Sequence, residues 1–273
     1  MLPEPQRVRL DGLDLAYRTV GEEGAPTVVL LHGWASSLRM WDTTQASLAP
    51  RFRTIALDLP GHGASSKPEW TWYSIPRYAE VVARFADHFA LDGIAAIGHS
   101  MGGTIALELA SGGGIDLRRV IVVNPVVTGR VYSHNILIKD TWVDSAVRVS
   151  RRLWPAASRL LRRPPNGLRR AMPDYVVRNR EDLAMTTADS ALGSMRAVLT
   201  WDLRERLPAV RTRTLVIVGE ADRVVAPSEG EVAARSIPRA RLVRLPAGHH
   251  PYDEVPQAFF AAIESFLREE TAS

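Results

Sequence analysis

The feature that most constrains this chain is a serine held in a glycine-rich turn, Gly98-His99-Ser100-Met101-Gly102-Gly103. A short apolar run, residues 94–97, precedes the turn, and a helix-like stretch, residues 104–110, follows it. The glycines at 98 and 102 let the backbone turn sharply enough to strain Ser100 and to direct its hydroxyl outwards. This G-x-S-x-G pattern between a strand and a helix is typical of a nucleophile elbow. It predicts a reactive serine at the end of a buried strand.

Apolar runs alternate with helix-like stretches on both sides of this turn. The expected strands lie at 7–10, 13–20, 27–31, 53–59, 94–97, 120–123, 214–218 and 241–245. The first two flank Asp11-Gly12 and predict a hairpin. Several of the others are continuously apolar, as in parallel strands covered on both faces. Helices are expected at 38–48, 78–91, 258–267 and from Ser228, where Ser228 and Glu231 match a capping box. The pattern predicts an α/β fold with a mostly parallel sheet and helices on both faces.

Residues 126–200 depart from this alternation. No strand signal stands out there, and the sequence predicts several helices broken at Pro155, Pro164-Pro165, Gly167 and Pro173. The segment holds 13 Arg and Lys against six Asp and Glu, although the whole chain has a formal net charge of only +4. A shift of charge that coincides with a shift of pattern predicts an inserted basic helical unit. The chain would then consist of a core in two parts, 1–125 and 201–273, around this insertion. The alternative is that the segment is simply more of the helical layer of the core.

Composition excludes several classes of protein and site. The chain has no cysteine, which rules out disulfides and thiolate nucleophiles. Acidic residues are interleaved with the basic ones, so we expect no nucleic-acid partner. No apolar run approaches the ~18 residues of a membrane span, and the first seven residues lack the apolar segment of a secretory signal. We therefore expect a cytoplasmic protein without a transmembrane segment. Metal-binding and nucleotide-binding motifs are missing, so we expect no metal and no cofactor.

The chemistry-bearing residues follow separate strands. Trp34, Ser100, Asp222 and His249 come shortly after four of the expected strands, and parallel strands would bring them to one edge of the sheet. A serine hydroxyl needs a base to take its proton, and a histidine base needs a carboxylate to fix its tautomer. Ser100, Asp222 and His249 supply these groups in the order expected of an elbow serine. The backbone N–H groups of Met101 and Trp34 are the expected oxyanion donors.

These motifs together resemble the α/β-hydrolase superfamily. The resemblance covers about 26–125 and 201–268 and is weaker across 126–200. It rests on Leu-His-Gly-Trp, Asp-Leu-Pro-Gly-His-Gly, Gly-His-Ser-Met-Gly-Gly, Gly-Glu-Ala-Asp and Gly-His-His-Pro. The resemblance implies an eight-stranded sheet with an antiparallel second strand and a helical cap inserted after the sixth strand, where residues 126–200 fall. It also implies the same nucleophile, acid, base and oxyanion donors.

Ser100 has no competitor nearby, whereas Asp222 and His249 each have one. Glu220 lies close to Asp222, but the resemblance places the acid at Asp222. His250 is adjacent to His249, and the family pattern Gly-His-x-Pro favours His249 as the base. His99 flanks the nucleophile in the wrong direction for a base and is expected to pack under the elbow. Three further residues are expected to be structural: His32, Asp58 and His62.

The predicted activity is hydrolysis of small or medium carboxylic esters through an acyl-Ser100 intermediate. The alternatives that keep the same residues are thioesterase, lactonase, perhydrolase, carbon–carbon bond hydrolase and lyase. A ligand receptor without turnover is the alternative from another class. Serine at the nucleophile position argues against haloalkane dehalogenases and epoxide hydrolases, which carry aspartate there.

The basic residues of the expected cap suggest a second kind of partner. They include Arg151-Arg152, Arg162-Arg163 and Arg169-Arg170. Such a cluster could attract an acidic acyl carrier, coenzyme A or an anionic lipid surface. The competing interpretation is an ordinary solvated helix face.

Overall fold

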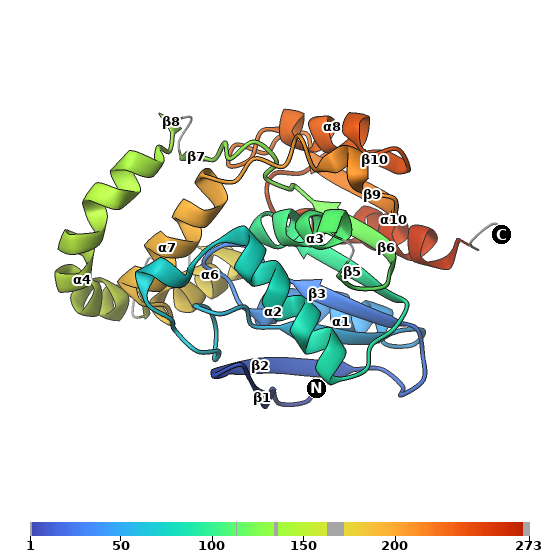
Figure 1. Ribbon diagram of the computed structural model, residues 1–273, viewed down its shortest axis with the longest axis horizontal. Coiled ribbons are helices and arrows are strands. Elements are labelled where there is room, and N and C mark those ends of the chain that lie inside the picture. Colours follow the sequence, from blue (N-terminus) through green and yellow to red (C-terminus); the bar gives the residue numbers. More distant parts are fainter. Residues whose placement is uncertain (1, 113, 134–135, 163–171, 270–273) are drawn as a thin grey trace.

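An eight-stranded sheet organises the protein (Figure 1). The computed structural model describes residues 2–112, 114–133, 136–162 and 172–269. The strands are β1 Gln6–Leu10, β2 Leu13–Val20, β3 Thr27–Leu31, β4 Arg53–Leu57, β5 Ile94–His99, β6 Leu117–Val123, β9 Arg213–Gly219 and β10 Ala240–Leu245. Their order in the sheet is β1-β2-β4-β3-β5-β6-β9-β10.

Strand directions agree with the sequence prediction. β2 pairs antiparallel with β1 and β4, and the remaining neighbours pair in parallel. The Asp11-Gly12 hairpin is confirmed, because Leu10 lies opposite Leu13 and both turn residues have positive φ. The eight strands and the antiparallel second strand are therefore confirmed, and the carboxyl ends of β3, β5, β6, β9 and β10 share one edge of the sheet.

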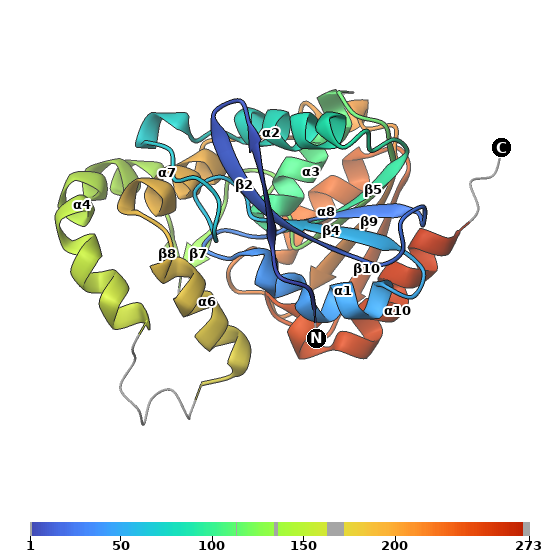
Figure 2. The same ribbon diagram turned by 90° about the horizontal axis from the view of Figure 1, so that it is seen from below.

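Helices cover both faces of this sheet. The helical elements of the core are η1 Leu38–Trp41, α1 Asp42–Leu48, η2 Trp70–Trp72, α2 Ile75–His88, α3 Met101–Gly112, η3 Leu207–Ala209, α8 Pro227–Ser236, α9 Pro251–Glu254 and α10 Pro256–Arg268. Buried residues of α2, α3 and α8 pack on one face, and those of α1 and α10 pack on the other. Figure 2 shows the two layers on opposite sides of the strands.

Predicted helix starts differ from the structure in several places. α2 begins at Ile75 rather than residue 78, and α10 begins at Pro256 rather than residue 258. The helix expected from Leu38 begins as a turn of 3₁₀ helix, capped by the Ser37 hydroxyl, and becomes α-helical at Asp42. The capping box expected at Ser228 does not form, because α8 already begins at Pro227. Proline is favoured at a first helical position, where its missing N–H has no helical partner to lose.

The inserted segment, residues 126–200, lies beside the sheet (Figures 1 and 2). It contains β7 Tyr132–Ser133, β8 Ile136–Leu137, α4 Asp140–Arg162, α6 Asp174–Ala184 and α7 Ala188–Leu199. No strand was predicted in this segment, yet β7 and β8 form a short antiparallel pair. Their two-residue length explains why no alternating pattern was visible.

Helix α4 runs through Pro155, so the predicted break at this position is wrong. A proline inside a helix loses one backbone hydrogen bond, which costs about 3 kcal/mol. Packing of α4 on α6 and α7 offsets this loss, together with a hydrogen bond from the Trp154 indole to the Thr186 carbonyl oxygen at 2.8 Å. Pro173 precedes α6 as predicted, whereas Pro164-Pro165 and Gly167 lie outside the described residues.

Candidate active site

Ser100 occupies a strained turn between β5 and α3. Its φ is +51°, a left-handed conformation that costs a non-glycine residue roughly 1–2 kcal/mol. Its backbone N–H donates to the Val123 carbonyl oxygen at 2.9 Å, which ties the turn to the end of β6. A Cβ on Gly98 would lie 2.2 Å from the Gly102 carbonyl oxygen, and one on Gly102 would lie 2.2 Å from the Leu31 carbonyl oxygen. Close backbone packing therefore requires both glycines of the motif.

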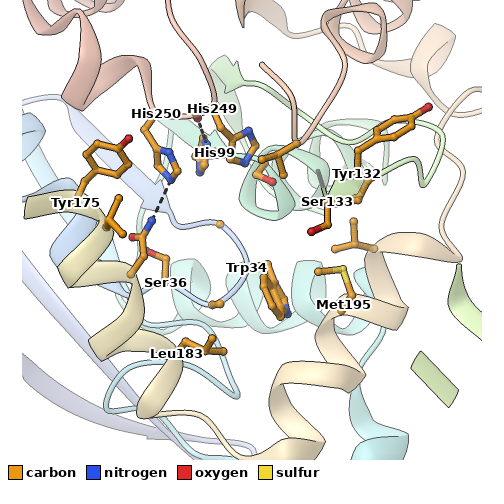
Figure 3. Close-up of a pocket in the computed structure, with 18 of the residues that line it drawn as sticks. Trp34, Ser36, His99, Tyr132, Ser133, Tyr175, Leu183, Met195, His249 and His250 are labelled. Atoms are coloured by element: carbon orange, nitrogen blue, oxygen red, sulfur yellow. Dashed lines mark hydrogen bonds between the residues drawn. The ribbon is translucent and has the colours of Figure 1, made fainter. Parts of the chain in front are cut away.

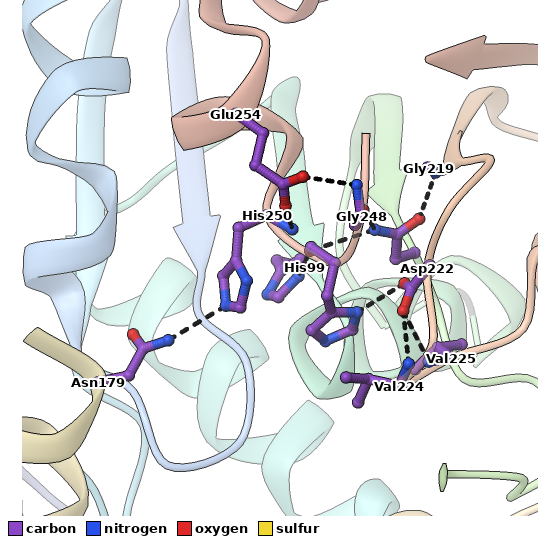
Figure 4. Close-up of polar contacts among 11 residues, drawn as sticks. His99, Asn179, Gly219, Asp222, Val224, Val225, Gly248, His250 and Glu254 are labelled. Carbon is purple, nitrogen blue, oxygen red and sulfur yellow. Dashed lines mark hydrogen bonds and ion pairs between the residues drawn. The ribbon is translucent and has the colours of Figure 1, made fainter. Parts of the chain in front are cut away.

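Asp222 and His249 form a direct pair. The Asp222 Oδ2 atom lies 2.7 Å from His249 Nδ1, and the aspartate side chain is fully buried. Because a carboxylate only accepts, Nδ1 of His249 carries the hydrogen and Nε2 is left as the basic nitrogen. The Asp222 Oδ1 atom accepts from the backbone N–H groups of Val224 at 2.7 Å and Val225 at 3.0 Å (Figure 4). Glu220 is exposed, so Asp222 is the acid that meets the histidine.

The side chain of Asn124, a residue that no sequence motif indicated, holds the loop that carries His249. The Asn124 Nδ2 atom donates to the carbonyl oxygens of Gly248 at 3.2 Å and His249 at 3.1 Å, and its Oδ1 atom accepts from the Gly219 N–H at 2.8 Å. One side chain thus joins the ends of β6 and β9 to this loop. The available sequence signal was an asparagine directly after a buried strand and before Pro125, because asparagine tolerates the left-handed conformation found there, with a φ of +46°.

His99 and Glu254 support the same loop (Figure 4). Nε2 of His99 donates to the His249 carbonyl oxygen at 2.8 Å. Burial, reinforced by the neighbouring His249, holds the pKa of His99 well below its usual range, so this ring is neutral. The Glu254 carboxylate accepts from the N–H groups of Gly248 at 2.7 Å and His250 at 3.0 Å. Each of these groups positions the histidine loop through its backbone.

His250 turns away from Asp222 and towards the inserted segment. Its Nε2 atom lies 3.1 Å from Asn179 Nδ2, and its ring packs against Tyr175 with the ring centroids 5.1 Å apart. Burial, followed by the charges of His249 and Arg178, lowers the pKa of His250 to about 3. A neutral His250 therefore accepts a hydrogen bond from the Asn179 amide.

The two expected oxyanion donors belong to segments that lie next to Ser100. Met101 is the first residue of α3, where a helix leaves its initial N–H groups without helical acceptors. A Cβ placed on Gly33 would lie 3.4 Å from the Ser100 Cβ. The following residue, Trp34, lines the same cavity as Ser100 and donates its indole N–H to the Ala191 carbonyl oxygen at 2.7 Å.

His32 and Asp58 brace the loops around this edge of the sheet. His32 Nε2 accepts from the Leu59 N–H at 3.0 Å, and burial lowers the pKa of His32 to about 4. The Asp58 carboxylate accepts from the N–H groups of Leu38 and Ala64, each at 2.7 Å. Both side chains are buried and hydrogen-bonded to backbone groups, as expected of residues with a structural role.

A cavity of about 530 Å³ opens over the serine (Figure 3). The core contributes Ser100, His249, His250 and the loop after β3, and the inserted segment contributes residues of β7, α6 and α7. Most of the lining is apolar, as in many small-molecule sites. Asp222 stands behind His249 and does not line the cavity. Three residues predicted from separate strands thus come together, with the nucleophile and the base facing one space.

The described residues contain neither a cluster of metal ligands nor a membrane-spanning helix. Within the described residues, no group of three or more His, Asp or Glu side chains is arranged to hold a metal ion. In that same part of the chain, no helix is both long and apolar enough to cross a membrane.

The fold and this site define the class of protein. Residues 26–256 match the family described as alpha/beta hydrolase fold, and the chain belongs to that family.

Known relatives place the chain among hydrolases of several kinds. A hydrolase of known structure from Pseudomonas aeruginosa PA01 superposes with a TM-score of 0.83 at 32% sequence identity, covering 97% of this chain and 98% of the other. The 3-oxoadipate enol-lactonase 2 of Acinetobacter baylyi is 28% identical, with 93% of each chain covered. The pimeloyl-[acyl-carrier protein] methyl ester esterase of Nitrosomonas europaea is 27% identical, covering 88% of this chain and 95% of the relative.

Proposed function

We propose that this protein is a serine hydrolase of small or medium carboxylic esters, with Ser100 as nucleophile, His249 as base and Asp222 as the acid that orients His249. One observation carries the proposal. A serine on a strained turn and a histidine paired to a buried aspartate face the same apolar cavity, although they follow three different strands. Such an arrangement is the one that activates a weak nucleophile.

The reaction would proceed in two halves. Ser100 Oγ attacks the ester carbonyl carbon while its proton passes to His249 Nε2, and the N–H groups of Met101 and Trp34 stabilise the oxyanion. The carbon–oxygen bond to the alcohol then breaks, and the alcohol leaves with that proton. Water attacks the acyl-enzyme next, giving its proton to His249, and the acid leaves as Ser100 is protonated again. Asp222 stays ionised and stabilises the charged imidazole in both halves.

A lactone is an internal ester, so lactone hydrolysis is the second candidate. The same steps apply, except that the alcohol remains attached to the product. The lactonase relative covers nearly the whole chain, which supports this candidate. The limited volume of the cavity favours small substrates of either kind.

We also infer that residues 126–200 act as the cap that selects substrate. Helices α6 and α7 supply much of the cavity wall that faces Ser100, including Tyr175, Leu183, Met195 and Val198. Changes at these positions should alter acyl preference while leaving the Asp222–His249 pair intact.

An acidic acyl carrier remains a proposed partner for the basic side of this cap. Arg151 pairs with Asp189 and Arg162 donates to the Ala184 carbonyl oxygen, while Arg163 and Arg169-Arg170 lie outside the described residues. The exposed arginines Arg148, Arg152 and Arg159 on α4 are the candidates that remain. Activity on a charged carrier should then fall steeply as ionic strength rises, whereas an unchanged KM would remove this partner.

The test of the activity uses p-nitrophenyl esters of increasing acyl length. The wild type should hydrolyse them with a maximum at short or medium chains, and Ser100→Ala should lose turnover. Ser145→Ala, a change of the same kind at an exposed position on α4, is the matched control and should keep wild-type rates. Turnover retained in Ser100→Ala would refute the nucleophile. Failure of the wild type on every ester and lactone would favour a receptor or another reaction.

A further inference from the structure

The cavity contains a cation without a counter-ion. Arg180 of α6 lines the cavity, and its Nε atom is buried without a hydrogen-bond partner in the described part of the chain. None of the ion pairs formed among the described residues includes Arg180. Although Arg180 as a whole is only partly buried, its Nε atom lies in an apolar space, where an anion or another acceptor would satisfy it.

Neighbouring arginines differ from Arg180 in having a carboxylate partner, although the Nε atom of Arg178 is likewise buried without a hydrogen bond among the described residues. Arg178, also on α6, lies 2.6 Å from an Asp253 carboxylate oxygen. Arg39, which faces α6 from η1, pairs with Glu181 at 3.0 Å and with Asp182 at 3.2 Å. Asp253, Glu181 and Asp182 thus pair with other arginines, and Arg180 has no ion pair among the described residues.

Ser36 offers a second unsatisfied group in the same cavity. This residue is only 6% exposed, and its Oγ atom has no hydrogen-bond partner among the described residues. Figure 3 shows Ser36, Tyr175 and His250 on one side of the cavity, with Tyr132, Ser133 and Met195 on the other. Arg180 lies on α6, the helix that carries Tyr175 and Asn179. Arg180 and Ser36 therefore both belong to the side of the cavity that α6 forms.

We propose that Arg180 and Ser36 form a carboxylate-binding site on the α6 side of the cavity, so that the substrate is an ester or lactone that also carries a free carboxylate. The inference rests on the proposed ester hydrolysis and adds the chemical class of the substrate. A guanidinium donates through a planar fork that matches a carboxylate, and the hydroxyl supplies a further donor. One cation in a small cavity balances one negative charge, which favours a carboxylate over a doubly charged phosphate ester.

The test compares esters that differ only in one charge. In one series, monomethyl esters of straight-chain dicarboxylic acids are compared with the corresponding dimethyl esters. In a second series, acetate esters of hydroxy acids are compared with the methyl esters of those compounds, which moves the carboxylate to the alcohol part. For each pair, the ratio of kcat/KM for the anionic ester to that for the neutral ester is measured. The wild type should favour the anionic member in one of the series.

The variants separate a charge effect from a general loss of activity. Arg180→Met should lower this ratio by ~10- to 100-fold, as expected for the loss of a charge-assisted hydrogen bond, and Arg180→Lys should lower it less. Ser36→Ala should lower the ratio by a smaller factor. Arg84→Met removes the same charge from an exposed position on α2, far from any proposed binding role, and should keep the wild-type ratio.

Two results would overturn the inference. A wild type without preference for the anionic ester in either series would refute it, as would an Arg180→Met variant that loses activity equally on both members of a pair. If the wild type hydrolyses no ester at all, the proposed function fails separately. Calorimetric binding of the same intact esters then decides about the site: tighter binding of the anionic member that is lost in Arg180→Met supports it, and equal binding refutes it.

Discussion

Asp182 connects the inserted segment to the core through a hydrogen bond and an ion pair. We predict that this carboxyl group makes the free energy of unfolding rise as the pH falls. Its carboxylate, on α6, accepts from the Ser37 hydroxyl at 2.9 Å and pairs with Arg39 at 3.2 Å. The side chain is fully buried. Burial raises the pKa of Asp182 from 3.8 to about 6, because the loss of hydration outweighs the help from Arg39 and Ser37.

The sign of the effect follows from proton uptake. Between pH 3.8 and about 6, the folded protein holds a proton on Asp182 that the unfolded chain has released. This group therefore contributes stability at low pH, and the contribution is lost as the pH rises through the folded pKa. At about 1.4 kcal/mol per pH unit, the full effect on the free energy of unfolding is ~3 kcal/mol. About 2 kcal/mol of this falls between pH 7 and pH 4.

The assay is urea unfolding at a series of pH values, followed by fluorescence, for the wild type and Asp182→Asn. Since asparagine does not titrate, the difference in unfolding free energy between the two proteins isolates this group from the other carboxylates. The wild type should gain ~2 kcal/mol relative to Asp182→Asn on going from pH 7 to pH 4. Asp144→Asn, the same substitution at a half-exposed carboxylate on α4, is the matched control for the change from aspartate to asparagine. A relative loss of wild-type stability towards pH 4 would mean that Arg39 lowers the pKa of Asp182, and would refute the reasoning.

Two further predictions concern the scaffold of the site. Asn124→Ala leaves one buried N–H without its acceptor and two carbonyl oxygens without their donor, in a left-handed conformation. The variant should lower the free energy of unfolding by ~3 kcal/mol in urea titrations, and displacement of His249 should reduce kcat. A loss of unfolding free energy below ~1 kcal/mol would instead show that water replaces the amide. Gly102→Ala places a Cβ 2.2 Å from the Leu31 carbonyl oxygen and should prevent stable folding, whereas a Cβ on Gly112 of the same helix meets nothing within 4 Å. Soluble expression and thermal unfolding should therefore separate Gly102→Ala from Gly112→Ala, and similar midpoints for the two variants would contradict the steric argument.

The strands and the site residues at their ends could be predicted because they depend on local sequence pattern. Buried parallel strands are continuously apolar, and an elbow needs small residues at fixed spacing around its serine. The secondary structure of the segment between β6 and β9 was harder to predict. Pro155 predicted a break, but packing on two neighbouring helices keeps α4 continuous. The strands β7 and β8 are too short to produce a period.

By itself, the sequence determined the α/β architecture, the family and the candidates Ser100, Asp222 and His249, since each rests on residues adjacent in the chain or at the end of a recognisable strand. Only the tertiary structure identified Asn124 as a support of the histidine loop, and Arg180 as a cavity residue whose Nε atom has no hydrogen-bond partner among the described residues. Asparagines and arginines are common on protein surfaces, and their roles depend on which partners the fold brings within hydrogen-bond distance. That information lies in contacts between residues far apart in the chain, which no local pattern records.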